Sequence, residues 1–269
     1  MRFSAWFTGT ESIFADHVIR GVPMLSAAAC IEMVRAAMAL SGDALPLTLK
    51  RVIWLRPVRV NASALTVHVC LKRTESRTIA FSIYSESHDG DAADASAHQL
   101  HCQGHGQPGT LTPSQRSSLV DQAHTARGES VAAQECYRLF EQLGVQYGLT
   151  HRTLRNVVRP RSNGVKMAIG ELEQLARTPG CLIDPGTLDG ALQATVGVWE
   201  GDGASGSPSP RVPFAVDSID IHADTPVRCT AYILKRPRPD SAEPIFDLDL
   251  CGESGSLCVR LRGMIVRPV

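Results

Sequence analysis

The sequence predicts an α+β fold made of two similar halves, and three observations support this prediction. An apolar helical segment precedes a series of strand segments in the first half of the chain, and the same order recurs in the second half. Residues 105–128 are rich in Gly, Pro, Ser, Gln and Thr and are predicted to be a linker between the halves. Both helical segments are rich in small residues, which allow neighbouring elements to pack closely against them.

The first half begins with a short strand at residues 3–7, a turn at residues 8–10 and an extended segment that carries His17. A helix is predicted over residues 27–40, and the Ser26 hydroxyl can cap its N-terminus. Alternation of apolar and polar residues then indicates half-buried strands. Three strands, a polar hairpin loop and a closing strand are expected at residues 47–60, 65–73, 77–86, 87–97 and 98–104.

The second half begins with a predicted helix at residues 132–143 and a turn at residues 144–148. A second apolar helix is predicted over residues 181–199, with Gly190, Ala194 and Gly197 as a small-residue face. Before it we expect strands at 154–159 and 164–171 and a short turn or helix at 172–177. After it we expect a flexible loop at 201–210 and strands at 219–223, 227–235, 246–250 and 257–266.

A long helix with a small-residue face, wrapped by one antiparallel sheet, is the arrangement called a hotdog. The order of elements therefore predicts an α+β double hotdog. The expected units are an N-terminal hotdog at residues 1–104, the linker at 105–128 and a C-terminal hotdog at 129–269.

Composition narrows the classes of function. The chain is 43% hydrophobic, and its 27 basic residues balance 27 acidic residues, so no net charge favours nucleic acid or an anionic membrane as a partner. No apolar run approaches the ~20 residues that a membrane-spanning helix needs. The eight cysteines form no C-x-x-C pair and most lie in apolar runs, which favours buried free thiols in a reducing compartment over disulfides. We therefore expect a cytoplasmic protein.

His17 is the first candidate for chemistry. Gly21, four residues later, permits close approach of the backbone, and the helix that begins near Ser26 offers unpaired N–H groups with partial positive charge. A carbonyl oxygen bound there would be polarised, with the imidazole beside it to accept a proton. The alternative is a structural histidine beside an apolar helix.

Asp189 and Gln193 are the second candidate pair. Their i, i+4 spacing places them on one face of a helix, so Gln193 can orient Asp189 or the group that Asp189 protonates. Burial among the apolar neighbours of Asp189 would favour the protonated carboxyl that a general acid needs. The alternative is an exposed Asp in the first turn of a helix, where the helix dipole stabilises it.

These motifs resemble the dehydratase domains of modular polyketide synthases. The motif H-x-x-x-G-x-x-x-x-P, which leads into a helix with a Leu/Ile-Glu-Met signature, is matched at His17, Gly21 and Ile31-Glu32-Met33, but Ser26 replaces the proline. The motif D-x-x-x-Q/H is matched by Asp189 and Gln193. The turn G-Y-x-Y-G-P-x-F is matched in part, since Gly144, Tyr147 and Gly148 agree while Val145, Leu149 and His151 depart.

The resemblance implies an enzyme without a metal or redox cofactor, whose substrate is tethered to an acyl carrier protein by a phosphopantetheine arm. His17 would remove a proton from the carbon alpha to the thioester, and Asp189 would protonate the leaving β-hydroxyl. The residues expected to contact or support the substrate are Gly21, Ser26, Tyr147, Gly148, His151 and Gln193. Neighbouring synthase domains and a second copy of the chain are further expected partners. Residues 52–57 and 212–214 resemble members from synthases with free-standing acyltransferases.

The departures at Ser26 and His151 leave the reaction open. Relatives that depart at these motifs include pyran-forming cyclases, which add a distal hydroxyl to an enoyl thioester by oxa-Michael addition, and double-bond-shifting isomerases. Dehydration needs both a base and an acid, whereas the other two reactions can rely mainly on the base. Because Asp189 and Gln193 are both present, dehydration is the first expectation. A non-catalytic docking or dimerisation module is the remaining alternative.

Overall fold

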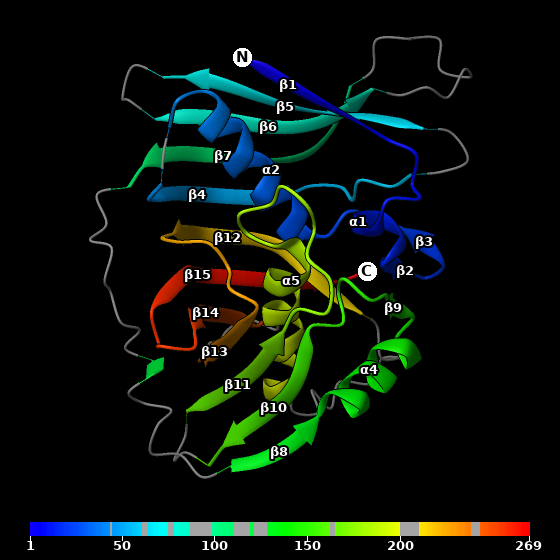
Figure 1. Cartoon of the computed structure of the whole chain (residues 1–269), viewed down its shortest axis with the longest axis vertical. Coiled ribbons are helices and arrows are strands. Elements are labelled where there is room, and N and C mark those ends of the chain that lie inside the picture. The colour runs from blue at the N-terminus through cyan, green and yellow to red at the C-terminus, as the bar shows by residue number, and fades with distance from the viewer. Residues whose placement is uncertain are drawn as a thin grey trace.

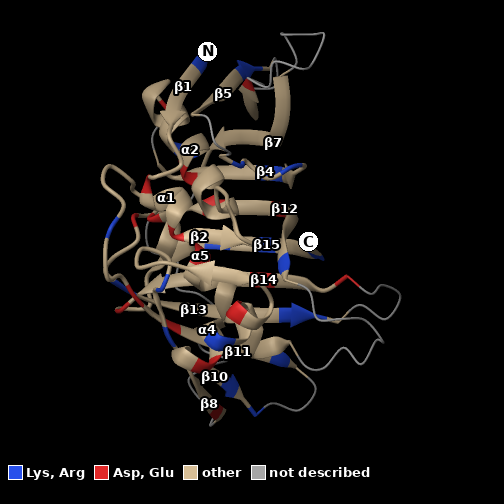
Figure 2. Cartoon of the chain, turned by 90° about the vertical axis from the view of Figure 1, so that its right-hand side faces the viewer, with Lys and Arg blue, Asp and Glu red and all other residues tan. Residues whose placement is uncertain are grey.

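A computed structural model describes residues 1–43, 45–60, 64–74, 78–86, 98–109, 119–120, 128–161, 165–199, 210–237 and 243–269. One antiparallel sheet of twelve strands runs through the molecule, from β1 (Arg2–Phe7) at one end to β8 (Gly128–Ala132) at the other (Figure 1). Helices α2 (Ala27–Leu40) and α5 (Pro185–Gln193) lie on the same side of this sheet (Figures 1 and 2). The predicted α+β double hotdog is confirmed.

The first half contains a short helix, α2 and seven strands. Besides β1 and α2 these are α1 (Ser12–Ala15), β2 (His17–Ile19), β3 (Val22–Pro23), β4 (Leu47–Trp54), β5 (Leu65–Arg73), β6 (Ile79–Glu86) and β7 (His98–Pro108). The second half has α5 followed by the 3₁₀ helix η1 (Ala194–Val198). Its other elements are β8, α4 (Ala133–Gln142), β9 (Val145–Tyr147), β10 (Leu154–Pro160), β11 (Lys166–Glu173), β12 (Arg211–Ile221), β13 (Arg228–Arg236), β14 (Ile245–Gly252) and β15 (Leu257–Pro268).

The two halves share one continuous sheet, because β4 of the first half pairs with β12 of the second. The strand order is β1-β5-β6-β7-β4-β12-β15-β14-β13-β11-β10-β8. At the seam Leu49 lies opposite Ile219, and the Thr48 hydroxyl donates a hydrogen bond of 2.8 Å to the Asp220 carboxylate. Neither hotdog therefore leaves a free sheet edge where the halves meet.

A second, three-stranded sheet, β3-β2-β9, also joins the halves. Strand β2 of the first half pairs with β9 of the second, and His17 lies opposite Tyr147 in this pair. The turn predicted at residues 144–148 therefore contains a short strand. Its three residues are too few for alternation along the chain to reveal them.

Small residues let both helices approach the sheet, as the sequence predicts. A Cβ atom at Gly197 would overlap the side chains of Val157 on β10 and Ala168 on β11, and one at Gly190 would overlap Thr153. On the first half, Gly106 of β7 leaves room for the Met38 side chain of α2. The core thus lies between each helix and its sheet.

Several predicted boundaries differ from the structure. The helix expected over 181–199 is shorter, because Asp184 caps it, Pro185 occupies its first turn, and the chain tightens into η1 at Ala194. Strand β12 begins at Arg211 rather than 219, since pairing with β4 and β15 outweighs the polar residues in this stretch. Strand β4 ends at Trp54, before Pro57, and β7 continues to Pro108 into the expected linker. Most of the linker and the loops expected at 87–97 and 201–210 lie outside the described residues, Pro210 excepted.

Candidate active site

The hairpin of β2 and β3 determines the tautomer of the His17 imidazole. The backbone N–H of Met24 donates to the carbonyl of His17 at 3.0 Å, and His17 Nδ1 lies 2.9 Å from the carbonyl oxygen of Met24. Because a carbonyl oxygen can only accept, Nδ1 carries the ring proton. In the neutral imidazole Nε2 is therefore the nitrogen that carries the lone pair, which is the tautomer that a general base needs.

Gly21 contributes to this geometry through the backbone turn. Arg20 and Gly21 both have positive φ angles, 51° and 77°, and they join Ile19 to Val22 in a two-residue hairpin turn. The turn returns the chain so that Met24 reaches His17. A Cβ atom at Gly21 would meet nothing within 4 Å, so the close approach that the sequence suggested at this glycine is not found.

Ser26 caps α2, as predicted. Its Oγ accepts a hydrogen bond of 3.2 Å from the backbone N–H of Ala29, and the residue is buried. Ser26 does not line the main cavity, whereas Ala27, the first residue of α2, does. The structure therefore places the beginning of the helix, rather than the serine hydroxyl, at the cavity.

Asp16 connects this hairpin to the second half, and sequence reasoning missed it. Its Oδ2 accepts hydrogen bonds from the backbone N–H and the hydroxyl of Thr150, at 2.9 and 2.7 Å. Its carbonyl accepts one from the N–H of Gly148 at 2.8 Å, and any Cβ at Gly148 would overlap the Asp16 side chain. This contact, which we call the Asp16 clasp (Asp16, Gly148 and Thr150), joins residues 134 positions apart.

Asp189 is buried, 6% exposed, which decides between the two readings of its environment. The amide nitrogen of Gln193 donates to Asp189 Oδ2 at 2.8 Å and to the carbonyl of His151 at 3.0 Å. The i, i+4 contact inferred from the sequence is therefore present. Gln193 Oε1 is buried and has no hydrogen-bond partner among the described residues.

His151 lies behind the site, fully buried, with its ring 5.4 Å from that of His17. The Thr150 hydroxyl donates its hydrogen bond to Asp16. Its oxygen, 3.1 Å from His151 Nδ1, therefore accepts a hydrogen bond from that nitrogen. Burial lowers the pKa of His151 to about 4, although nearby Asp189 opposes that shift. His151 is therefore neutral near pH 7. It is not among the residues that line the cavity.

A cavity of about 400 Å³ lies between the two halves. Its polar lining includes His17, Tyr147, Asp189, Gln193 and Thr195, and most of the rest is apolar, including Ile19, Leu25, Val145 and Leu192. Burial raises the pKa of the Tyr147 hydroxyl well above its usual range, and Asp189 adds to the rise, so Tyr147 keeps its proton. The cavity can hold an apolar chain with its polar end beside a base and a carboxyl group.

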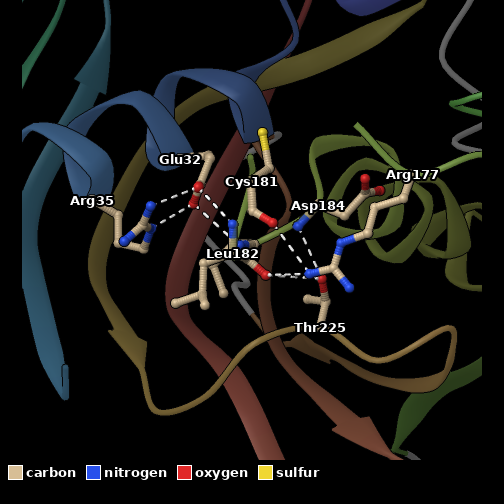
Figure 3. A network of polar contacts seen from close by, with 8 residues as sticks. Glu32, Arg35, Arg177, Cys181, Leu182, Asp184 and Thr225 are labelled. Carbon is tan, nitrogen blue, oxygen red and sulfur yellow. Dashed lines mark hydrogen bonds and ion pairs between the residues drawn. The ribbon is translucent and has the colours of Figure 1, made fainter. Parts of the chain in front are cut away.

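Glu32 explains how α5 is held beside α2 (Figure 3). Its carboxylate pairs with Arg35 in a fork of 2.7 and 2.8 Å and accepts the backbone N–H groups of Leu182 and Ile183 at 2.8 and 3.1 Å. Leu182 and Ile183 lead directly into Asp184, the cap of α5. Glu32 therefore positions the helix that carries Asp189. The sequence signals for this residue were a charge inside an apolar helix and the Ile31-Glu32-Met33 signature, and neither identifies its distant partners.

The described residues contain no group of three or more His, Cys, Asp or Glu side chains arranged to hold a metal ion. No helix in the described part of the chain is long and apolar enough to cross a membrane. All eight cysteines are free, as expected, and acidic and basic residues are both distributed along the molecule (Figure 2).

Two protein-family models match the chain. One is described as polyketide synthase dehydratase domain and matches residues 1–86; the other is described as polyketide synthase dehydratase N-terminal domain and matches residues 116–269. Among curated proteins, the chain is 28% identical to polyketide synthase PksM of Bacillus subtilis and 32% identical to polyketide synthase ThaG of Burkholderia thailandensis. These alignments cover 100% and 99% of the chain but only 6% and 4% of the relatives.

A solved structure has the same fold. The trans-AT polyketide synthase dehydratase domain from Brevibacillus brevis superposes with a TM-score of 0.87 at 24% sequence identity. The superposition covers 100% of this chain and 94% of that one. At this level of identity the likeness supports the fold and leaves the reaction to be argued from the site.

Proposed function

The chain belongs to the polyketide synthase dehydratase family, and from this membership we propose that it removes water from a β-hydroxyacyl thioester to give a 2-enoyl thioester. The acyl chain is carried on the phosphopantetheine arm of an acyl carrier protein, and no separate cofactor takes part. The chain acts as one domain among others of a larger synthase, of the kind supplied by free-standing acyltransferases. The large excess in length of its curated relatives supports this context.

His17 Nε2 takes a proton from the α-carbon, and the electrons of that C–H bond form the new C=C bond. Asp189 gives its proton to the β-hydroxyl, the C–O bond breaks and water leaves. The start of α2 at Ala27 is suited to polarise the thioester carbonyl. Gln193 orients Asp189 through its amide nitrogen.

One observation carries this proposal: a histidine whose Nδ1 is held by a backbone carbonyl and an oriented, buried carboxyl group line the same cavity from different halves of the chain. A reaction that relied mainly on the base, such as cyclisation or a double-bond shift, would not require the Asp189–Gln193 pair. A docking module would require neither group. The geometry therefore favours dehydration over these three alternatives.

The test is to offer the protein a 3-hydroxyacyl pantetheine thioester and, separately, a 2-enoyl thioester with a distal hydroxyl. We expect loss of water from the first, detected by mass spectrometry, and no isobaric ring product from the second. Asp189→Asn and His17→Ala should each lower kcat by about 10²- to 10⁴-fold, which is typical of general acid–base groups.

Exposed residues supply matched controls. His105→Ala and Asp224→Asn change the same residue types outside the cavity and should retain the parent activity. Full activity of His17→Ala would refute the mechanism. Ring formation that survives Asp189→Asn would establish the cyclase alternative instead.

A further inference from the structure

The mouth of the active-site cavity is rich in arginine. A residue that lines the cavity and is also exposed to solvent lies where the cavity opens. The lining residues that are exposed, which together we call the cavity mouth, are Leu55, Arg56, Pro57, Arg59, Arg267 and Pro268. The cavity mouth thus contains three arginines and no acidic residue, although acidic and basic residues balance over the whole chain.

Two of these arginines lie on a segment whose backbone is held in place. Arg56 follows β4, and its backbone N–H donates to the carbonyl of His101 on β7 at 3.3 Å. Further along, the carbonyl of Val58 accepts a hydrogen bond of 3.0 Å from the backbone N–H of Leu25. Arg56 and Arg59 therefore extend from a backbone that is tied both to the main sheet and to the segment before α2.

The positive charges of Arg56 and Arg59 have no carboxylate beside them. Arg267, at the end of β15, forms an ion pair of 2.7 Å with Glu243, whereas neither Arg56 nor Arg59 forms an ion pair with any described residue. Among the described residues that line the cavity, Asp189 is the one carboxylate, and it is buried. The cavity mouth therefore favours an anion from whatever enters the cavity.

We propose that the cavity mouth binds the phosphate of the phosphopantetheine arm, with Arg56 and Arg59 as its charged partners. This inference rests on the proposed function, in which that arm carries the substrate, and adds the residues that receive the arm. The arm has an uncharged pantetheine chain with the thioester at one end and the phosphate at the other. With the thioester beside the buried His17, the phosphate lies towards the exposed end of the cavity. Guanidinium groups suit this anion because they offer several hydrogen-bond donors in one plane.

The test compares two 3-hydroxyacyl thioesters with the same acyl chain, one on pantetheine and one on phosphopantetheine. We expect kcat/KM to be about 10-fold higher for the phosphorylated substrate, as one charge-assisted hydrogen bond provides. The gain should lie in KM rather than in kcat, because the phosphate is bound equally before and during the reaction. It should shrink as salt is added, since the charges lie at the solvent-exposed end of the cavity.

Variants assign the gain to the cavity mouth. Arg56→Gln and Arg59→Gln should each lower the ratio of the two kcat/KM values, and the double variant should remove the preference. The ratio cancels any loss of folding or activity that affects both substrates alike. Arg56→Lys and Arg59→Lys keep the charges and should retain a higher ratio than the Gln variants. Arg138→Gln, at an exposed arginine on α4 that does not line the cavity, is the matched control and should keep the parent ratio.

Binding measured without turnover tests the cavity mouth independently of the reaction. In an NMR titration, phosphopantetheine should bind about 10-fold more tightly than pantetheine, and also more tightly than inorganic phosphate. Absence of turnover with both thioesters, together with this binding, would remove the proposed dehydration and leave the phosphate subsite in place.

Three results would overturn the inference. The first is equal binding of phosphopantetheine and pantetheine. The second is a preference for the phosphorylated form that survives in the double variant of Arg56 and Arg59. The third is inorganic phosphate that binds as tightly as phosphopantetheine, which would mean that the arginines attract any small anion and do not recognise the arm.

Discussion

At the residue scale, two buried histidines of the site take their tautomers from neighbours that can play only one role. The Met24 carbonyl forces the proton of His17 onto Nδ1. The Asp16 carboxylate accepts the hydrogen bond of the Thr150 hydroxyl, so the Thr150 oxygen can only accept from His151, and the ring proton of His151 lies on Nδ1. The site is therefore set for chemistry before substrate binds, which is the basis of electrostatic preorganisation.

A prediction about pH follows for His151. Its pKa is about 4 in the folded chain against an ordinary value of 6.5. Between these values the unfolded chain binds more protons than the folded one, so the free energy of unfolding falls as pH falls from 6.5 towards 4. By pH 4.5 this group should have removed about 2–3 kcal/mol of stability relative to pH 7. His151→Phe should lack this loss.

Urea unfolding of the parent and of His151→Phe at pH 7 and pH 4.5 measures the effect. The other titrating groups contribute to both proteins, so the difference between the two pH dependences reports on His151. His105→Phe, at an exposed histidine, should keep the parent's pH dependence. A parent-like pH dependence in His151→Phe would show that the buried imidazole is protonated without cost.

At the scale of elements, local signals predicted the first helix better than the second. Ser26 followed by a mostly apolar run marks α2, and its bounds agree with the sequence prediction. The second helix ends early, since Thr195, Val196 and Gly197 have weaker helix propensity and pack closely as η1. Strand β9 has meaning only through its pairing with β2, which no local pattern reveals.

The site shows the same division. The i, i+4 spacing of Asp189 and Gln193 is local, and the contact was predicted. The partners of Asp16 and Glu32 lie 134 and about 150 positions away, and single-sequence reasoning has no access to such contacts. The resemblance to a family indicated that Glu32 is part of a motif but not that it holds α5.

Glu32→Gln tests that role. The substitution removes the charge that pairs with Arg35 and places an amide N–H₂ against one of the two backbone N–H groups, because each of them binds a different carboxylate oxygen. Breaking a buried ion pair costs about 3–5 kcal/mol, so we expect a loss of that size in the free energy of unfolding, with reduced kcat because α5 carries Asp189. Glu141→Gln is the matched control. Its pair with Arg152 is 2.7 Å long but about half exposed, and should contribute no more than about 1 kcal/mol. Equal losses in the two variants would contradict the role of Glu32.

At the scale of the whole molecule, four of the contacts that join the two hotdogs within the described residues stand out. Strands β4 and β12 pair in the main sheet, β2 and β9 pair in the small sheet, and the Asp16 clasp and Glu32 connect loops and helices. Separating the halves would expose the paired edges of β4 and β12. It would also leave the buried Glu32 carboxylate without its backbone donors. We infer that the halves unfold together.

Hydrogen exchange tests this cooperativity, because the most protected amides of a cooperative unit exchange only by its global opening. Leu248→Ala in β14 and Ile83→Ala in β6 each remove a fully buried side chain and should each cost about 2–5 kcal/mol. If the molecule is one unit, Leu248→Ala lowers the opening free energy of the β6 amides as much as that of the β14 amides. Ile83→Ala likewise lowers the opening free energy of the β14 amides as much as that of the β6 amides. Each variant is thus the control for the other. Protection lost only in the substituted half would mean that the seam between β4 and β12 opens independently, and that the pairing of His17 with Asp189 depends on an equilibrium between docked and separated halves.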